Sequence, residues 1–161
     1  MIQKILAKMI EYDANDPRRI HHFLKVYGFA HLIGELEGLA KDELFTLDIA
    51  AILHDIGIHL AEAKYGSSNG KYQEELGPDE ARKLLSEFAL SDEVVERVCF
   101  LIAHHHTYSD VDGLDYQILL EADFLVNAYE DDLSTDAIAS FREKVFRTKT
   151  GIKILNTMFG L

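Results

Sequence analysis

His54 and Asp55 stand side by side in the apolar run "IAAILHDIGIHL". A buried carboxylate is costly unless it is paired or bound to a metal. Two other segments place similar residues among apolar neighbours: His21 and His22 in "RRIHHFLKV", and Asp123 in "LLEADFLVN". Imidazole and carboxylate ligands together suit Fe, Mn, Co, Ni or Zn, whereas Mg prefers more oxygen. The residue types therefore indicate one divalent metal site built from three segments.

Each of these residues alone has a structural explanation. A single histidine on a helix is usually a hydrogen-bonded core or surface residue, and a single Asp can cap a helix or pair with Arg. The explanation weakens for the whole set, because these residues have few cations near them in sequence. Cys99 is the sole cysteine and lies in "VCFLIA", where a buried thiol is expected. Neither an intramolecular disulfide nor a structural cysteine–zinc site is therefore available.

The segments that must position the metal-type residues have helical periodicity. Asp16 followed by Pro17 predicts a helix that starts there and runs to about Leu39. The run that contains the His-Asp pair is expected to be a buried helix that ends near Gly57. Adjacent side chains on a regular helix point about 100° apart. Both members of the pair can reach one ion if the helix ends at that point.

Helical patterns continue along the rest of the chain, and no alternating run typical of a strand is present. The further expected helices are "MIQKILAKMIEYDAND", "PDEARKLLSEFAL", "SDEVVERVCFLIAHHH", "YQILLEADFLVNAYE", "STDAIASFREKVF" and "GIKILNTMF". The polar, glycine-rich stretch "EAKYGSSNGKYQEELG" predicts a surface loop and a candidate lid. The expected fold is all-α, in a single domain over residues 1–161.

Composition narrows the classes of function. The chain of 161 residues is 48% hydrophobic, which favours a globular protein. Its net charge of -12 opposes binding to a nucleic acid polymer but leaves room for a small phosphorylated substrate. No run reaches the roughly 18 apolar residues of a membrane span, and the N-terminus does not resemble a signal peptide. We therefore expect a cytoplasmic protein without a membrane partner, and exposed apolar positions near the C-terminus would permit a homodimer.

The order His…His-Asp…Asp, centred on "AAILHDIG", resembles the HD superfamily of metal-dependent phosphohydrolases over residues 18–127. "HHFLKV" resembles the first-helix motif of that family, in which a histidine precedes a valine by four positions, so that Val26 selects His22. "LLEADFLVN" resembles the helix that supplies the last aspartate. The resemblance implies an HD-domain helical bundle around a central divalent ion (Mn, Fe, Co, Ni, Zn or Mg). The ligands that it implies are His22, His54, Asp55 and Asp123.

The family pattern also bears on the number of ions. Metal pairs in the superfamily use additional histidines between the His-Asp doublet and the last Asp. Here "IAHHHTY" offers His104, His105 and His106, but "EELGPDEARKLL" contains no histidine, so one ion is expected. His105, three positions after Ile102, is the candidate that faces the pocket and takes part in catalysis. The alternative is a histidine at a helix C-terminus that interacts with the helix dipole.

A phosphorylated substrate needs cations beside the metal. Arg19 and Arg18 precede His22 by three and four positions, about one helical turn. Arg19 is a candidate catalytic residue and both arginines are candidate phosphate ligands, with a surface ion pair as the alternative for either. Lys64 and Lys71 flank the glycine-rich stretch and could close over an anionic substrate, or be ordinary solvated lysines.

Together, these features favour a phosphohydrolase that cleaves a small phosphate ester, such as a nucleotide, with metal-activated water. Asp55 would bind the metal and could also act in catalysis by accepting the proton of that water. Two alternatives remain open at this point. One is a non-catalytic module that binds a metal or a nucleotide, and the other is a dinuclear-iron oxygenase, a class that the same superfamily contains.

Overall fold

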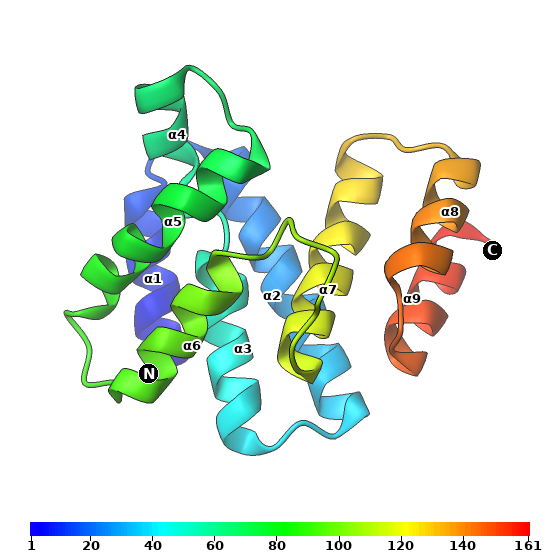
Figure 1. Ribbon diagram of the computed structural model, residues 1–161, viewed down its shortest axis with the longest axis horizontal. Helices are drawn as coiled ribbons and strands as arrows, with labels where there is room; N and C mark the ends of the chain where they lie inside the picture. The colour runs from blue at the N-terminus through cyan, green and yellow to red at the C-terminus, as the bar shows by residue number, and fades with distance from the viewer.

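The computed structural model describes residues 1–161 as nine α-helices with no strand (Figure 1). This confirms the all-α fold that the periodicity predicts. The helices are α1 (Ile2–Tyr12), α2 (Pro17–Glu37), α3 (Lys41–Leu53), α4 (Ile58–Tyr65), α5 (Gly70–Leu85), α6 (Asp92–Ile102), α7 (Leu114–Glu130), α8 (Thr135–Val145) and α9 (Lys149–Phe159).

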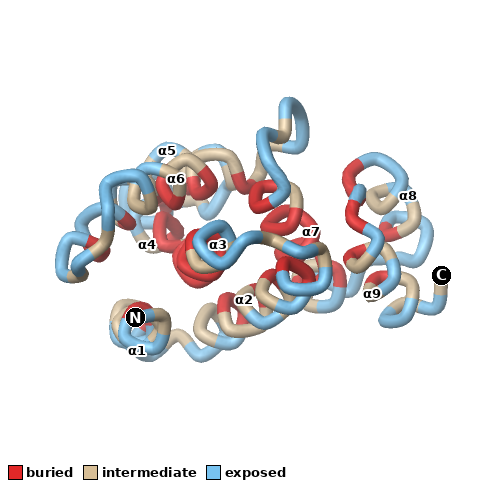
Figure 2. The backbone as a smooth tube through the Cα atoms, turned by 90° about the horizontal axis from the view of Figure 1, so that it is seen from below, coloured by how far each residue is buried: buried red, intermediate tan, exposed pale blue.

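Helix α3 is the centre of the bundle. Every residue from Thr46 to Leu53 is buried, so the second half of this helix is covered on all sides. Helices α1, α2, α6 and α7 pack against it, and Figure 2 shows its buried backbone among these neighbours. Helices α8 and α9 lie beyond α7 at the C-terminal end of the molecule (Figure 1). The predicted metal ligands come from α2, α7 and the end of α3, three helices that pack on one another.

Helix α2 begins and ends close to where its sequence predicts. The side chain of Asp16 accepts a hydrogen bond from the backbone N–H of Arg19 (3.1 Å). Pro17 occupies the first turn, where a helix needs no backbone N–H. Gly38 ends the helix in the left-handed region (φ 79°), which glycine adopts without a side-chain clash. These two ends fix the register in which His22 faces the interior.

Helix α3 ends at Leu53, before the predicted end near Gly57. A tight turn over residues 54–57 follows, and its last hydrogen bond runs from Ile58 N–H to Asp55 O (3.0 Å). Helix α4 begins directly after this turn. Because the chain leaves the helix here, the two adjacent side chains of the His-Asp pair are no longer held about 100° apart.

The prediction of a long surface loop and lid over residues 62–77 is wrong. Helix α4 extends to Tyr65 and α5 begins at Gly70, so only four residues separate the two helices. Pro78, which the sequence favours as a helix start, lies inside α5. The reason is a close packing of backbones: a Cβ on Gly57 would lie 2.9 Å from the backbone nitrogen of Gly77. The turn after α3 therefore packs directly on the backbone of α5, one residue before its proline.

One segment, Lys41–Tyr65, is long and apolar enough to cross a membrane when judged by length and composition alone. In the structure, 67% of its most apolar window is buried inside the protein. The segment comprises α3, the turn after it and α4, and its buried part is mainly the second half of α3, in the core of the bundle. A buried core helix explains its hydropathy.

Candidate metal centre

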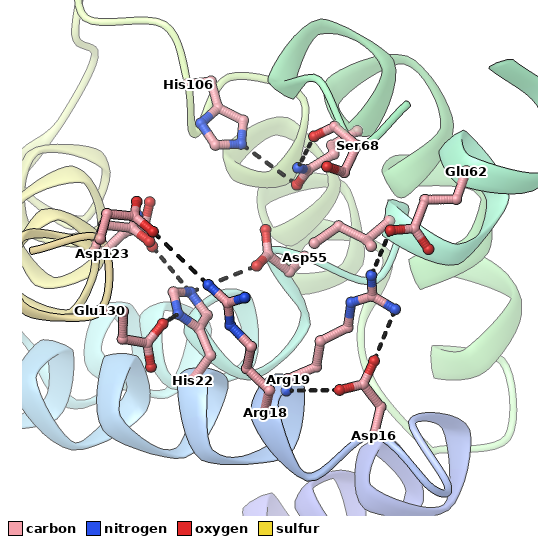
Figure 3. Close-up of a pocket in the computed structure, with 14 residues that line it drawn as sticks. Asp16, Arg18, Arg19, His22, Asp55, Glu62, Ser68, His106, Asp123 and Glu130 are labelled. Atoms are coloured by element: carbon pink, nitrogen blue, oxygen red, sulfur yellow. Dashed lines mark hydrogen bonds and ion pairs between the residues drawn. The ribbon is translucent and has the colours of Figure 1, made fainter. Parts of the chain in front are cut away.

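Ligand-type atoms from three helices meet at the end of α3. His22 Nε2 lies 3.2 Å from His54 Nε2 and 3.2 Å from Asp123 Oδ1. His54 Nε2 lies 3.5 Å from the same oxygen. Atoms that bind one ion at about 2.0–2.2 Å stand at comparable separations from each other. The structure therefore brings three of the four predicted ligands around one point, two of which are visible in Figure 3.

Asp55, the fourth predicted ligand, lies between this group and a second one. Its Oδ2 is 3.5 Å from the Nε2 atoms of both His22 and His54. Its Oδ1 is 3.4 Å from Nε2 of His105, which follows α6. Asp55, His105 and His106 form a second set, whose ligand atoms all lie within 4.8 Å of one another. Asp55 thus offers one oxygen to each set.

Hydrogen bonds at the opposite ring nitrogen fix the tautomer of three histidines. His22 Nδ1–H donates to Glu130 Oε2 (2.8 Å). His54 Nδ1–H and His105 Nδ1–H each donate to the backbone carbonyl three residues earlier (2.8 and 2.7 Å). Carbonyls and carboxylates only accept, so the ring supplies the proton. In the neutral ring, Nε2 then presents a lone pair to the centre, which is the form of histidine that binds metals.

Burial and charge oppose each other at this centre. Burial alone would lower the pKa of His54, but the negative charge of Asp55 and the hydrogen bond of Asp123 outweigh it and raise this pKa to about 9. Burial alone would raise the pKa of the Asp123 carboxyl, yet its hydrogen bonds with His22 and His54 hold this pKa well below the ordinary value. A metal that binds here displaces protons from the imidazoles, because it needs their lone pairs.

The donor set fits a divalent ion. His105 Nε2 is buried and has no hydrogen-bond partner within the protein. Buried polar atoms are nearly always satisfied, and an ion at the centre or a ligand of that ion would satisfy this one. Neutral imidazoles together with carboxylates match Mn, Fe, Co, Ni or Zn better than Mg. The residues that would hold an ion are His22, His54, Asp55 and Asp123.

An open cavity of about 400 Å³ gives access to this centre (Figure 3). Its 14 lining residues comprise six carboxylates, two arginines, two histidines, three uncharged polar residues and one hydrophobic residue, Ile58. His22, Asp55 and Asp123 belong both to the metal centre and to the lining. A ligand in the cavity therefore reaches the metal centre directly.

The two predicted arginines both line the cavity but differ in what they contact. Arg19 is tied down: its guanidinium donates to His59 Nδ1 (3.0 Å) and pairs with Asp16 (2.9 Å) and Glu62 (2.6 Å). The side chain of Arg18 is 77% exposed, and its nearest carboxylate, that of Asp131, is 3.8 Å away. Arg18, held only by this long and exposed ion pair, is thus the cation better placed to meet an anionic ligand, whereas Arg19 forms part of the fixed wall.

The two predicted lysines lie outside the residues that line the cavity. Lys64 pairs with Glu75 at 3.2 Å, and both side chains are exposed. Lys71 is exposed in the first turn of α5. Neither lysine is placed where it would contact a ligand bound at the metal centre.

The three histidines of the segment 104–106 have different surroundings. His105, the predicted pocket residue, is fully buried and directs Nε2 at Asp55. His106 lines the cavity itself and lies 3.4 Å from Gln73 Oε1. Burial, together with the electrostatic effect of the neighbouring His105, lowers the pKa of His106 to about 4. His104 turns away and donates from Nδ1 to a backbone carbonyl (2.7 Å).

Sequence reasoning missed several cavity residues, and some of them left a signal. Asn127 and Glu130 follow Asp123 by four and seven positions, which is the spacing of one helical face. Both line the cavity, and Glu130 also orients His22. Gln73 left no such signal, because its segment was expected to be a loop.

The helical bundle and its convergent His/Asp donors define a class of metalloproteins in which separate helices supply the ligands of a central ion. The HD domain model matches residues 19–139. The chain therefore belongs to the HD domain family, the metal-dependent phosphohydrolase family that the order of its metal-type residues resembles.

A solved structure is similar over nearly the whole chain. It is that of a predicted HD superfamily hydrolase from an uncultured Thermotogales bacterium, with 29% sequence identity and a TM-score of 0.70. The alignment covers 98% of this chain and 84% of the other. The comparison with curated proteins found no match.

Proposed function

We propose that this chain is a metal-dependent phosphohydrolase that cleaves a small phosphate ester. The observation that carries the proposal is the set of histidine Nε2 atoms and carboxylates that converge at an open polar cavity, with the exposed Arg18 in its lining. The similar Thermotogales protein, itself described as a predicted hydrolase, supports the same class.

Each part of the cavity has a role in this reaction. His22, His54, Asp55 and Asp123 would hold a divalent ion, which would supply a lowered pKa for a water molecule and polarisation of a phosphoryl oxygen. Asp55, which lines the cavity, would accept the proton of that water. Arg18 pairs with the phosphoryl oxygens, on which charge accumulates in the transition state. Glu130 keeps His22 in the tautomer that binds the metal, through the hydrogen bond of 2.8 Å.

The second set of donors favours one alternative function. Asp55, His105 and His106 lie close enough together to hold a second ion beside the first. A measured content of two iron ions per chain would favour the dinuclear-iron oxygenase. A content of one divalent ion per chain would favour hydrolysis. Helix α5, which carries Gln73, contributes no histidine to this second set, and this supports the single ion, since an amide oxygen is a weak ligand for these metals.

The same proposal includes the organisation and location of the chain. We propose one domain over residues 1–161, supported by the packing of α9, which lies beyond the matched residues, against α2 and α7. A cytoplasmic location is supported by the burial of the apolar segment Lys41–Tyr65 and by the single, unpaired cysteine.

The proposal is tested by measuring metal content and phosphate release on the same preparation. Protein purified without chelator is analysed for metals, then assayed with p-nitrophenyl phosphate and with phosphate esters before and after chelation. We expect turnover that is lost with the metal and in Asp123→Ala, but retained in Asp136→Ala, a matched change at an exposed position on α8. Bound metal without turnover would contradict hydrolysis and favour a binding module.

A further inference from the structure

The cavity lacks the surface that usually recognises a nucleobase. Bases are commonly held by stacking on aromatic side chains, and pockets for such ligands are mostly apolar. None of the seven tyrosines or nine phenylalanines of the chain lines this cavity, and Ile58 is its single hydrophobic residue. The cavity thus offers no platform for a planar base.

The two imidazoles of the lining do not replace that platform. Both nitrogens of His22 are engaged, Nδ1 by Glu130 and Nε2 within the metal centre. The ring of His106 packs 4.0 Å from the ring of His105, measured between centroids. It also lies against Gly70, where a Cβ would come within 2.6 Å of the His106 ring. These rings are parts of the wall.

Polar groups suited to hydroxyls take the place of aromatic ones. The side chain of Asn127 is half-buried on α7, lines the cavity and makes no hydrogen bond within the protein. Its amide can both donate and accept hydrogen bonds, so it can pair with a ligand hydroxyl that acts either as acceptor or as donor. The hydroxyl of Ser68 also lines the cavity without an internal partner. Carboxylate oxygens of Glu62 and Asp131 add acceptors.

Charge limits the ligand to a single phosphoryl group. The lining contains six carboxylates but only two guanidinium groups, and one of these, Arg19, is already paired with Asp16 and Glu62. One divalent ion does not offset the remaining negative charge. A second phosphoryl group or a carboxylate on the ligand would meet like charge, whereas neutral hydroxyl groups would meet hydrogen-bond acceptors.

The volume of the cavity is consistent with a ligand as small as a sugar monophosphate. A cavity of about 400 Å³ lies near the small end of the usual range of ligand sites, about 300–1,000 Å³.

We propose that the substrate of this site is a hydroxyl-rich monophosphate of the sugar or polyol class, and that a nucleoside monophosphate is a poor substrate. The proposal rests on the proposed phosphohydrolase function and narrows it. Asn127 is the specificity-determining residue: it hydrogen-bonds a hydroxyl of the ligand while Arg18 and the metal centre hold the phosphoryl group.

The first test compares ribose 5-phosphate with AMP, which carry the same phosphorylated ribose carbon and differ by the base. With metal-loaded full-length protein, we expect kcat/KM to be at least tenfold higher for ribose 5-phosphate. An equal or higher value for AMP would overturn the substrate class while leaving the phosphohydrolase function intact.

If neither compound is hydrolysed, a binding measurement tests the proposed ligand class independently of the proposed hydrolytic function. Calorimetric titration of the metal-loaded protein with both compounds then measures affinity without turnover. Tighter binding of ribose 5-phosphate would support the ligand class although the hydrolytic function had failed. Tighter binding of AMP, or no binding of either compound, would overturn the ligand class as well.

The second test is Asn127→Leu, which removes the amide and keeps a side chain of similar size. We expect kcat/KM for ribose 5-phosphate to fall about fivefold relative to p-nitrophenyl phosphate, which has no sugar hydroxyl. Gln3→Leu, the same amide loss at an exposed position on α1, is expected to leave the ratio unchanged. Metal content is measured for both variants. An unchanged ratio in a metal-loaded Asn127→Leu protein would overturn the role of Asn127.

Discussion

Replacing Glu130 by leucine removes the group that orients His22, a proposed metal ligand, without changing His22 itself. Glu130 Oε2 accepts the Nδ1–H of His22 at 2.8 Å. Without this acceptor, the proton of the neutral ring can move to Nε2, the nitrogen that faces the centre. The variant is therefore expected to bind a divalent metal more weakly while the ligands themselves remain in place.

The size of the effect follows from two independent considerations. The side chains of His22 and Glu130 are only 10% and 15% exposed, so the hydrogen bond is largely shielded from water. Hydrogen bonds to charged groups contribute about 1.5–3 kcal/mol. Loss of a partner that orients a metal-bound histidine typically lowers metal affinity by about 10- to 100-fold, or about 1.4–2.8 kcal/mol. We expect the dissociation constant to rise within that range.

The assay is calorimetric titration of Mn²⁺ or Zn²⁺ into chelator-treated protein. Lys25→Met is the matched control. Lys25 pairs with the other oxygen of Glu130 at 2.5 Å, so its replacement leaves the hydrogen bond between Glu130 and His22 in place. This variant should change the affinity by less than about threefold, as expected for a partly exposed ion pair. Wild-type affinity in Glu130→Leu, or an equal loss in Lys25→Met, would refute the reasoning.

Three further predictions concern stability. Gly57→Ala should lower the free energy of unfolding in urea by about 1–3 kcal/mol, because a Cβ there would lie 2.9 Å from the backbone of α5; unchanged stability would show that the helices can move apart. Tyr116→Phe should cost about 1–3 kcal/mol in the same assay, since the buried hydroxyl donates to the carbonyls of His104 and Thr107; a loss of less than 0.5 kcal/mol, on the scale set by one weak hydrogen bond, would argue against both bonds. In chelator-treated protein, the free energy of unfolding should fall as the pH rises from about 6.5 to 9. Burial opposes the rise in the pKa of His54, but the neighbouring carboxylates raise this pKa to about 9. The bound proton therefore stabilises the folded protein fully below pH 6.5, and this stabilisation is lost as the pH rises to about 9. A shift of that size corresponds to on the order of 3 kcal/mol, and a flat profile would contradict it.

Local signals in the sequence are enough to predict much of the framework. Asp16 and Pro17 mark the start of α2 through backbone capping, which depends only on neighbouring residues. The run Thr46–Leu53 indicates a buried helix because six of its eight residues are apolar. The His-Asp pair that follows it implies a break in that helix, and the structure has a turn there.

Contacts between segments far apart in the chain could not be predicted from the sequence. Pro78 lies inside α5 because Gly57 and Gly77 let two backbones meet, and no local pattern reports that contact. Arg19 has the helical spacing of a phosphate ligand, but its partners His59 and Glu62 come from α4. Helical periodicity places a side chain on a face and does not show which partners it finds there.

The central claim is that a metal held by His22, His54, Asp55 and Asp123 promotes attack of water on phosphorus. It is tested most directly by hydrolysing p-nitrophenyl phosphate in ¹⁸O-labelled water and analysing the released phosphate by mass spectrometry. We expect one solvent-derived oxygen in each phosphate formed by metal-loaded protein, and no enzymatic phosphate after chelation. Unlabelled phosphate, or the same labelled product at the same rate without metal, would contradict it.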